Sequence, residues 1–310
     1  MRKFLIILFL EGILFVFPGI IYASDIFENA SVASLGLGNT LYPFNPSCAF
    51  YNPASLMYVE KNQFVGSYYL LFNGARYNLL GFKQYIDKFA WSVQGIQLYR
   101  DGIEVRTSLT ETPDYLTYCS KTGALLTLAG LVDISGLKNI MLGSSLKLLY
   151  YDIAQTQSGL AVGVDLGLYK KEIFKTSSAS GKKFSVDCGL SITNIGGLNL
   201  QMGENIEIYP AGIRGSLILN YTIFPRYNQK KEKIDYDEIS MFCDFIGGKK
   251  SDTLFGIQYK LIEMLKLRIG YNRGGTTGGF SWEFENVGLN YALSIKEYTQ
   301  LHFLDLVYNF

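Results

Sequence analysis

Five stretches of the chain alternate apolar and polar residues with a period of two, and this pattern limits the fold more than any other feature. The stretches are residues 160–169, 184–193, 214–223, 265–271 and 287–296. Side chains on a β-strand point alternately to its two faces, so each stretch has one apolar and one polar face. Helical spacing is nowhere as clear. The chain is therefore predicted to be all-β.

Pairs of turn-forming residues lie before and between the alternating stretches. They are Asn73-Gly74, Asp101-Gly102, Gly196-Gly197, Gly247-Gly248 and Gly274-Gly275. Most of the stretches are about 9 to 11 residues long, which is the length that a tilted strand needs to cross a bilayer. The pattern indicates a transmembrane antiparallel β-barrel. At roughly 18 to 20 residues for each strand and its connection, the chain has room for about 12 to 14 strands.

A soluble β-barrel is the alternative, because it shows the same alternation. Its polar face meets water and carries many lysines and glutamates, whereas the polar face here is dominated by Gly, Ser, Asn and Thr. Charged residues make up 18% of the chain, below the roughly 25% of a soluble protein. Tyrosines near the ends of the stretches fit the aromatic girdles of a membrane barrel: Tyr150, Tyr151, Tyr169, Tyr221, Tyr271 and Tyr298. Composition therefore favours the membrane barrel.

The first 23 residues have the pattern of an export signal. Arg2 and Lys3 precede an apolar run over residues 4–21, and residues 22–24 (YAS) form a small-residue cleavage site. Glu11 inside the run argues against a permanent transmembrane helix, where a carboxylate is costly. We expect residues 1–23 to be a signal peptide and the mature chain to reach the bacterial outer membrane.

Several classes of function are excluded by composition. Lys plus Arg (28) nearly equals Asp plus Glu (27), so no basic surface is available for nucleic acid. The four cysteines form no C-x-x-C pair, and no metal or cofactor is expected. His302 is the sole histidine, and on a strand it faces away from Asp305, which excludes a local His-Asp dyad. We expect no catalytic residues and no enzyme activity.

The last residues form a strand that ends in an aromatic residue. Leu304, Leu306, Tyr308 and Phe310 share one face. This ending resembles the assembly signal of bacterial outer-membrane barrels, whose last strand is read by the insertion machinery. Tyr308 and Phe310 are therefore predicted to carry that signal, with the barrel-assembly machinery and membrane lipid as partners.

Residues 25–60 differ from the rest of the chain because they lack alternation and hold several glycines and prolines. Residues 34–39 (SLGLGN) and 49–56 (AFYNPASL, with Asn52, Pro53 and Ala54) resemble the start of PorV/FadL-type outer-membrane proteins. Further pieces resemble the family in order along the chain: residues 165–168 (DLGL), 194–196 (NIG), 213–215 (IRG), 256–259 (GIQY), 267–271 (LRIGY), 290–292 (NYA) and His302.

The resemblance implies a barrel of about 14 antiparallel strands over residues 61–310, with residues 24–60 folded inward as a plug or hatch. Glycines on the polar face have two interpretations. They make room for a plug or ligand, or they relieve bending strain in the barrel wall. These glycines are Gly143, Gly163, Gly167, Gly189, Gly270 and Gly288.

Five charged residues, Asp165, Asp187, Arg214, Lys266 and Arg268, fall on the polar faces of the predicted strands. Charges that face lipid at mid-membrane are costly, so these side chains are predicted to face the lumen. The favoured interpretation is ion pairing that ties the strands to the plug. The other is a polar end to a conduit that orients the carboxylate of an amphiphile. The charged run over residues 226–238 is expected to be a solvated loop.

The resemblance implies two functions of different classes. FadL-like relatives admit small hydrophobic or amphipathic molecules across the outer membrane, whereas PorV-like relatives receive or anchor cargo for a type IX-like secretion system. The connections between the predicted strands look short, which favours transport over an interaction role. Large rings of pore-lining charge, typical of open ion channels, are missing, so a general diffusion porin ranks third.

Overall fold

The computed structural model describes Phe27 and residues 30–71, 74–105, 113, 115–134, 137–153, 157–178, 182–202, 205–228, 233–247, 251–272, 275–296 and 299–310. The expected signal peptide, residues 1–23, lies outside the described residues. Within this described part, no helix has the length and apolarity to cross a bilayer.

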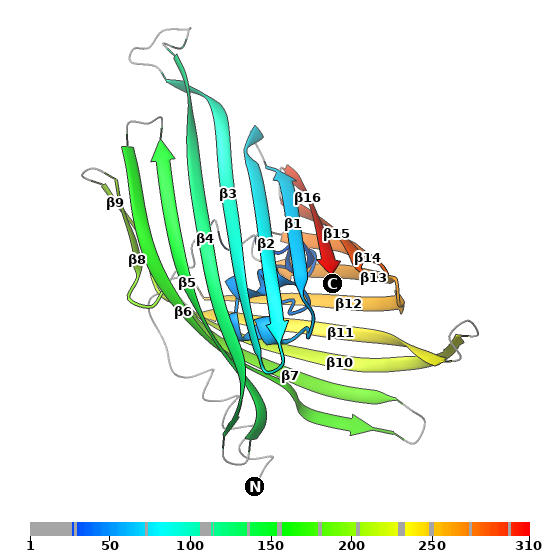
Figure 1. Ribbon diagram of the computed structural model, residues 1–310. Helices are drawn as coiled ribbons and strands as arrows, with labels where there is room; N and C mark the ends of the chain where they lie inside the picture. Colours follow the sequence, from blue (N-terminus) through cyan, green and yellow to red (C-terminus); the bar gives the residue numbers. More distant parts are fainter. Residues whose placement is uncertain are drawn as a thin grey trace.

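Fourteen of the described strands form one closed antiparallel barrel (Figure 1). Each strand pairs with its neighbour, and β1 pairs with β16 to close the barrel, from Gln63 opposite Asn309 to Leu70 opposite His302. The strands are β1 (Gln63–Leu70), β2 (Arg76–Ile86), β3 (Phe89–Val105), β4 (Tyr115–Ile134), β5 (Leu137–Ile153), β6 (Gln157–Ser177), β7 (Lys183–Thr193), β10 (Gly212–Asn228), β11 (Lys233–Gly247), β12 (Asp252–Ile262), β13 (Leu265–Asn272), β14 (Gly275–Phe284), β15 (Val287–Lys296) and β16 (Thr299–Asn309). The predicted all-β barrel of about 14 strands is confirmed.

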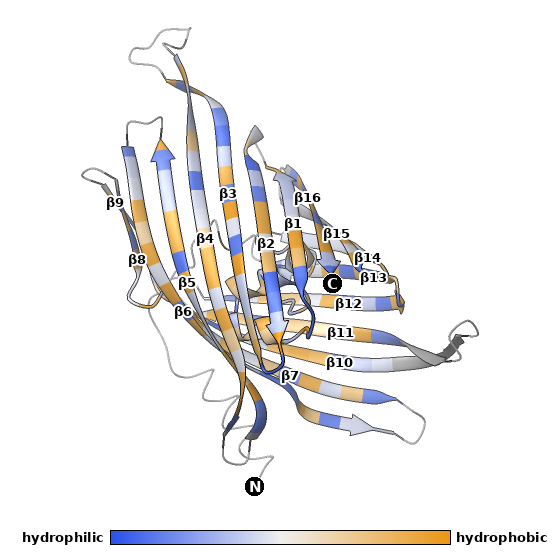
Figure 2. Cartoon of the chain, viewed as in Figure 1, coloured by the Kyte–Doolittle hydropathy of each residue, from blue (hydrophilic) through white to orange (hydrophobic). Residues whose placement is uncertain are grey.

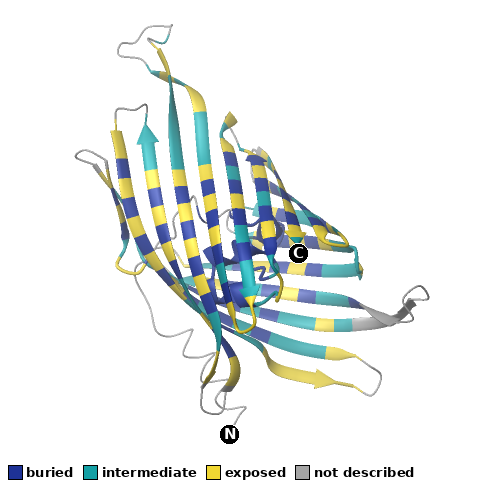
Figure 3. Ribbon diagram, viewed as in Figure 1, coloured by how far each residue is buried: buried dark blue, intermediate teal, exposed yellow. Residues whose placement is uncertain are grey.

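The apolar faces of the strands point outward. On β6, Leu160 is 63% exposed and Val162 is 53% exposed, whereas Ala161 and Asp165 between such residues are buried. Figure 2 shows the alternation of hydropathy along the strands, and Figure 3 shows the matching alternation of exposed and buried residues. A bilayer requires an apolar outer surface. It also requires that every strand edge is paired, and the closed barrel leaves none unpaired.

Two local predictions are wrong. Tyr151 and Tyr169 do not lie in an interfacial girdle: Tyr169 is fully buried and Tyr151 packs against the buried core, because they have the parity of the inward-facing Lys147 on β5 and Asp165 on β6. Tyr298 lies outside the described residues. The charged run over residues 226–238 is not a single loop. β10 and β11 continue pairing to Asn228 opposite Lys233, since an antiparallel hairpin tolerates charged residues on strands.

A separate two-stranded hairpin lies between β7 and β10 in the sequence. It consists of β8 (Leu198–Met202) and β9 (Asn205–Tyr209). Leu198 and Leu200 are fully buried, and a Cβ placed on Gly163 of β6 would lie 2.9 Å from the Leu198 side chain. The hairpin therefore packs on the inward face of β6, and no feature of the sequence pattern distinguished it from a barrel strand pair.

The face of β16 that holds Leu304, Leu306, Tyr308 and Phe310 is exposed. The rings of Tyr308 and Phe310 stack with centroids 5.9 Å apart. These residues therefore share one outward face, as the alternation required. The recognition of Tyr308 and Phe310 by assembly machinery stays a prediction.

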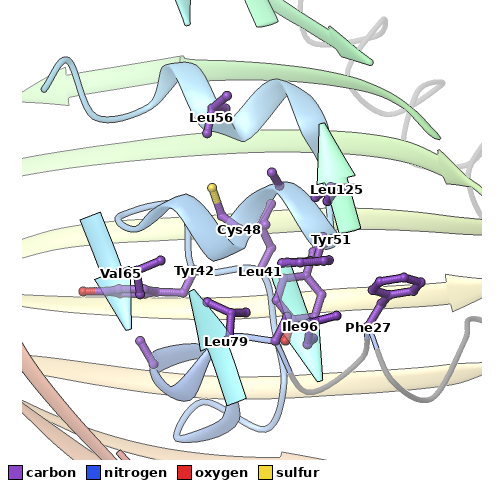
Figure 4. Close-up of a cluster of buried hydrophobic side chains, with 14 of the residues drawn as sticks. Phe27, Leu41, Tyr42, Cys48, Tyr51, Leu56, Val65, Leu79, Ile96 and Leu125 are labelled. Atoms are coloured by element: carbon purple, nitrogen blue, oxygen red, sulfur yellow. The ribbon is translucent and has the colours of Figure 1, made fainter. Parts of the chain in front are cut away.

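Phe27 and residues 30–62, which we call the inner segment, pack against the inward faces of the strands. The segment contains the short helix α3 (Val32–Leu35) and the 3-10 helices η1 (Pro46–Phe50) and η2 (Pro53–Met57). Prolines begin both 3-10 helices, where a missing N–H costs nothing. The segment supplies much of the buried core, and Figure 4 shows its side chains beside those of the wall strands: Phe27, Leu41, Tyr42, Cys48, Tyr51 and Leu56 with Val65, Leu79, Ile96 and Leu125.

Candidate functional site

The Asn52-Pro53-Ala54 motif attaches the inner segment to β6 and β7. Asn52 caps η2, because its Oδ1 accepts the N–H of Ala54 at 3.0 Å. Its Nδ2 donates to the carbonyl oxygens of Leu168 at 3.0 Å and Leu190 at 3.4 Å. One side chain thus stabilises the start of a helix and joins that helix to two strands of the wall.

Glycines of the wall leave space for this motif. A Cβ placed on Gly143 would lie 2.5 Å from the N of Ala54, and one placed on Gly167 or Gly189 would meet Asn52. Backbone and side chain of the inner segment therefore lie where Cβ atoms would otherwise be. At these positions the structure supports the interpretation that the glycines make room.

A second attachment joins the region around α3 to β11–β14. The N–H of Gly38, at φ 72°, donates to Oγ1 of Thr277 at 2.9 Å. Wall glycines make room here too, since a Cβ on Gly256 would lie 2.5 Å from the Leu37 carbonyl oxygen and one on Gly270 would overlap Gly38. The two attachments hold the inner segment against two separate arcs of the barrel, since β10 lies between them in the strand order. Of the glycines named from sequence, Gly288 would gain only ordinary contacts.

Arg214 of β10 lies between an acid and the inner segment. Its Nε donates to Oδ2 of Asp244 on β11 at 2.7 Å, and its Nη2 donates to the carbonyl oxygen of Asn39. The guanidinium lies 4.5 Å from the centroid of the Tyr51 ring. The same Asp244 oxygen accepts the N–H of Leu41 at 2.8 Å. This ion pair therefore contacts the inner segment at three points.

Lys266 and Arg268 share the inward face of β13. Arg268 donates from Nε to Gln258 at 3.0 Å and from Nη1 to Asn290 at 3.2 Å, and its guanidinium lies 4.5 Å from the Tyr42 ring. Lys266 pairs with Glu283 of β14, and its Nζ lies 5.5 Å from the Phe44 ring. Both cations therefore face aromatic side chains of the inner segment.

The two predicted acids lie elsewhere on the wall. Asp165 pairs with Lys147 at 2.7 Å and accepts the N–H of Asn194 at 2.7 Å. Asp187 accepts hydrogen bonds from the Tyr58 hydroxyl at 3.1 Å and from the Glu172 N–H at 2.8 Å. The five predicted residues thus lie on β6, β7, β10 and β13 and do not converge on one point.

Sequence reasoning missed two lysines that hold the end of the inner segment. Lys83 of β2 donates to the carbonyl oxygen of Val59, and Lys171 of β6 donates to that of Tyr58. Both carbonyls follow η2, where a helix leaves acceptors unpaired. Lys83 could have been recognised from the sequence as an inward-facing lysine, because it has inward parity on β2. Lys171 was not, because a bulge between Lys170 and Phe174 interrupts the alternation.

Burial keeps two ionisable groups of the inner segment neutral. Burial raises the pKa of the Cys48 thiol to about 11. Burial, reinforced by the nearby Asp187 carboxylate, also raises the pKa of Tyr58 well above its ordinary value. Tyr58 therefore remains a hydrogen-bond donor toward Asp187 at physiological pH. Among the residues that the structure describes, no group of three His, Cys, Asp or Glu side chains could hold a metal ion.

Comparison with known proteins gives a likeness of fold. The toluene transporter TbuX of Ralstonia pickettii superposes with a TM-score of 0.51 at 12% identity, over 92% of this chain and 99% of that one. The toluene transporter TodX of Pseudomonas putida gives 0.48 at 12% identity, over 94% and 98%. No protein-family model matches the chain, and no curated protein matches it. The described residues thus form a 14-stranded outer-membrane-type β-barrel that shares its fold with TbuX.

Proposed function

We propose that the chain is an outer-membrane channel through which small hydrophobic or amphipathic molecules cross or bind, with the inner segment as its plug. The observation that carries this proposal is a closed barrel, with the fold of the toluene transporter TbuX, whose interior holds a segment of its own chain. A barrel with an apolar outer face needs a bilayer, and a filled interior suits selective passage better than free diffusion.

The contacts of the interior support a plug that is held by specific bonds. Arg214 reaches the Asn39 carbonyl, Lys171 reaches the Tyr58 carbonyl, and Asn52 reaches the carbonyls of Leu168 and Leu190. These contacts favour ion pairing and bonding to the plug as the role of the predicted lumen charges, over a role in orienting a carboxylate. Opening then requires the exchange of a limited set of hydrogen bonds.

The remaining expectations belong to the same proposal. Residues 1–23 act as the export signal, membrane lipid and the barrel-assembly machinery are the partners, and the chain has no enzyme activity. Nothing in the comparisons supports the alternative role in a type IX-like secretion system, and we do not propose it.

The direct test is uptake into vesicles. The purified full-length protein is reconstituted into vesicles with an outer leaflet of lipopolysaccharide, which slows the passive entry of hydrophobic molecules. Entry of radiolabelled toluene and of a labelled fatty acid is measured against empty vesicles, and a heat-modifiability gel verifies that the barrel is closed. We expect at least one of the two to enter faster than in empty vesicles. Entry of both at the rate of empty vesicles would refute the channel.

A further inference from the structure

The hairpin of β6 and β7 extends beyond the strand on one side of it. β6 pairs with β5 only as far as Lys170, but it continues to Ser177, which lies opposite Lys183 of β7. We call residues 170–178 and 182–186 the β6–β7 tip. Both strands of the tip end in exposed residues (Figure 3). The tip therefore projects from the wall and presents its side chains to the surroundings of the barrel.

The tip lies at the end of the barrel that has the short connections. At this end β2 joins β3 across residues 87–88, and β14 joins β15 across residues 285–286. The longest connections between barrel strands, residues 106–114 and 194–211, lie at the opposite end. Bacterial barrels have short turns on the periplasmic side and longer loops outside the cell. By this rule the tip lies beside the periplasmic leaflet, which consists of phospholipid.

The outward face of the tip is apolar and continues the lipid-facing surface of the barrel. On β7, Phe184 and Val186 share the parity of Ile192, which is 39% exposed, and have the opposite parity to the buried Asp187. Phe174 of β6 lies opposite Val186, and its ring centroid lies 6.1 Å from that of Phe184. Exposed apolar surface marks contact with a membrane or with a partner. Continuity with the outer face of the barrel favours the membrane.

The tip is also the basic connection of this end. Residues 170–186 hold five lysines and one glutamate, a formal charge of +4. The other strand connections at the same end are neutral or acidic by sequence: residues 86–89, 133–138 and 226–238 hold equal numbers of acids and bases, and residues 262–265 and 283–288 hold acids only. Lys175 pairs with Glu172 at 2.8 Å, but both side chains are about half exposed, and such a pair contributes little. The positive charge is therefore available to an anionic ligand.

The base of the tip is held by the interior of the barrel. Lys171 donates to the carbonyl oxygen of Tyr58, and the N–H of Glu172 donates to Asp187 at 2.8 Å. The strand that carries the lysines is thus positioned before any ligand arrives. A site positioned in this way loses less conformational freedom on binding.

We propose that the β6–β7 tip binds an anionic phospholipid of the periplasmic leaflet, such as phosphatidylglycerol. The rings of Phe174 and Phe184 contact the boundary between headgroups and acyl chains, and Lys175, Lys182 and Lys183 lie at the phosphates. A lysine near an anionic membrane surface contributes roughly fivefold in binding, or about 1 kcal/mol. This inference goes beyond the channel and does not depend on it, because the site is on the outer side of the wall.

The test measures which lipid the purified full-length protein retains. The protein in a mild detergent is incubated with equal amounts of phosphatidylglycerol and phosphatidylethanolamine of different mass, and bound lipid is counted by native mass spectrometry. Phosphatidylethanolamine shares the phosphate but carries no net charge. We therefore expect phosphatidylglycerol to be retained more strongly, by a factor on the order of ten.

Three sets of substitutions locate the preference. Lys175→Gln/Lys182→Gln/Lys183→Gln should lose most of it. The arginine replacements at the same three positions keep the charge and should keep the preference, and a heat-modifiability gel verifies that each variant is a closed barrel. The matched control removes the same charge from three exposed lysines at the same end of the barrel and should also keep the preference: Lys61→Gln/Lys88→Gln/Lys138→Gln.

Three results would overturn the inference. One is equal retention of the two lipids by the unmodified protein, which needs no variant to fold. Another is an equal loss of preference in the two glutamine variants. The third is competition by lipid A that depends on the tip lysines and is stronger than that of phosphatidylglycerol, since the site would then belong to the outer leaflet. Uptake of toluene and of the fatty acid tests the channel separately, so each proposal can fail without the other.

Discussion

The hydroxyl of Tyr58 donates a hydrogen bond of 3.1 Å to the carboxylate of Asp187. The other oxygen of that carboxylate accepts the N–H of Glu172 at 2.8 Å, and Glu172 has a positive φ of 48° in the bulge of β6. A single side chain on β7 therefore joins the end of the inner segment to the irregular part of the neighbouring strand. A movement of Tyr58 or of the β6 bulge would therefore alter the hydrogen bonds of the same Asp187 carboxylate.

Replacing Asp187 with alanine should destabilise the protein, because the Tyr58 hydroxyl and the Glu172 N–H both lose their acceptor. Leaving a buried group unsatisfied costs about 1–3 kcal/mol, and the Tyr58 hydroxyl is the more buried of the two donors because Glu172 is an exposed residue. The free energy of unfolding is measured by urea titration in detergent with intrinsic fluorescence. Asp133→Ala is the control, because Asp133 also accepts a backbone N–H, from Asn139, but at an exposed site. Equal losses in the two variants would contradict the role assigned to Asp187.

Replacing Gly270 with alanine should displace the inner segment. The added Cβ would overlap the backbone of Leu37 and Gly38, and a forced fit of this kind costs about 1–3 kcal/mol. On a gel, the mobility of the folded barrel should be lost at a lower heating temperature in this variant than in the unmodified protein. Gly95→Ala, where a Cβ would meet nothing within 4 Å, should behave as the unmodified protein does. A Gly270→Ala protein of unchanged stability would show that the segment is not held against this strand.

Replacing Lys147 with methionine should destabilise the barrel strongly, because the buried Asp165 carboxyl would lose its cationic partner. The two side chains are 3% and 0% exposed, and breaking a buried ion pair on one side costs about 3–5 kcal/mol. Asp165→Leu in the same chain should recover much of the loss. Arg76→Met breaks an exposed pair and should cost about 0–1 kcal/mol. Urea titration of the unmodified protein and the three variants measures these differences. If Asp165→Leu does not restore stability in the Lys147→Met chain, the buried ion pair is not the cause of the loss.

The buried thiol of Cys48 should make stability depend on alkaline pH. Burial raises its pKa from an ordinary 9.0 to about 11, so between these values the thiol ionises only in the unfolded chain. Raising the pH from 8 to 10.5 therefore favours unfolding, by an amount on the order of 1 kcal/mol from this group. Cys48→Ser does not titrate in this range, so its stability relative to the unmodified protein should improve as the pH rises. A pH-independent difference would contradict the burial of the thiol.

The alternation of residues was sufficient to predict the barrel and the faces of its strands. It placed Asp165 and Arg214 inward because parity on a regular strand fixes the direction of every side chain. It failed where a strand is irregular: the bulge at Glu172 changes the parity, so Lys171 was missed. Tyr169 was misplaced because its residue type was given more weight than its parity. Strand parity alone would have placed Tyr169 correctly in the interior.

The candidate site was less predictable than the fold. The sequence singled out Asn52 and the wall glycines, yet it could not tell that Gly143 and Gly270 face two different parts of the inner segment. The pairing of Arg268 with Tyr42 joins residues far apart in the chain, and nothing in local spacing reports such a contact. Short-range patterns determine which residues point inward, whereas the order of fourteen strands determines which of them meet.

The hydrogen bond between Gly38 and Thr277 spans 239 residues of sequence. A chain made from its amino end therefore exposes the apolar inner segment long before β14 exists to receive it. Its partners on β6 and β7, such as the Leu168 and Leu190 carbonyls that Asn52 contacts, are made earlier than Thr277. The contact of the inner segment with β14 therefore cannot form until residues near the carboxyl end of the chain have been made.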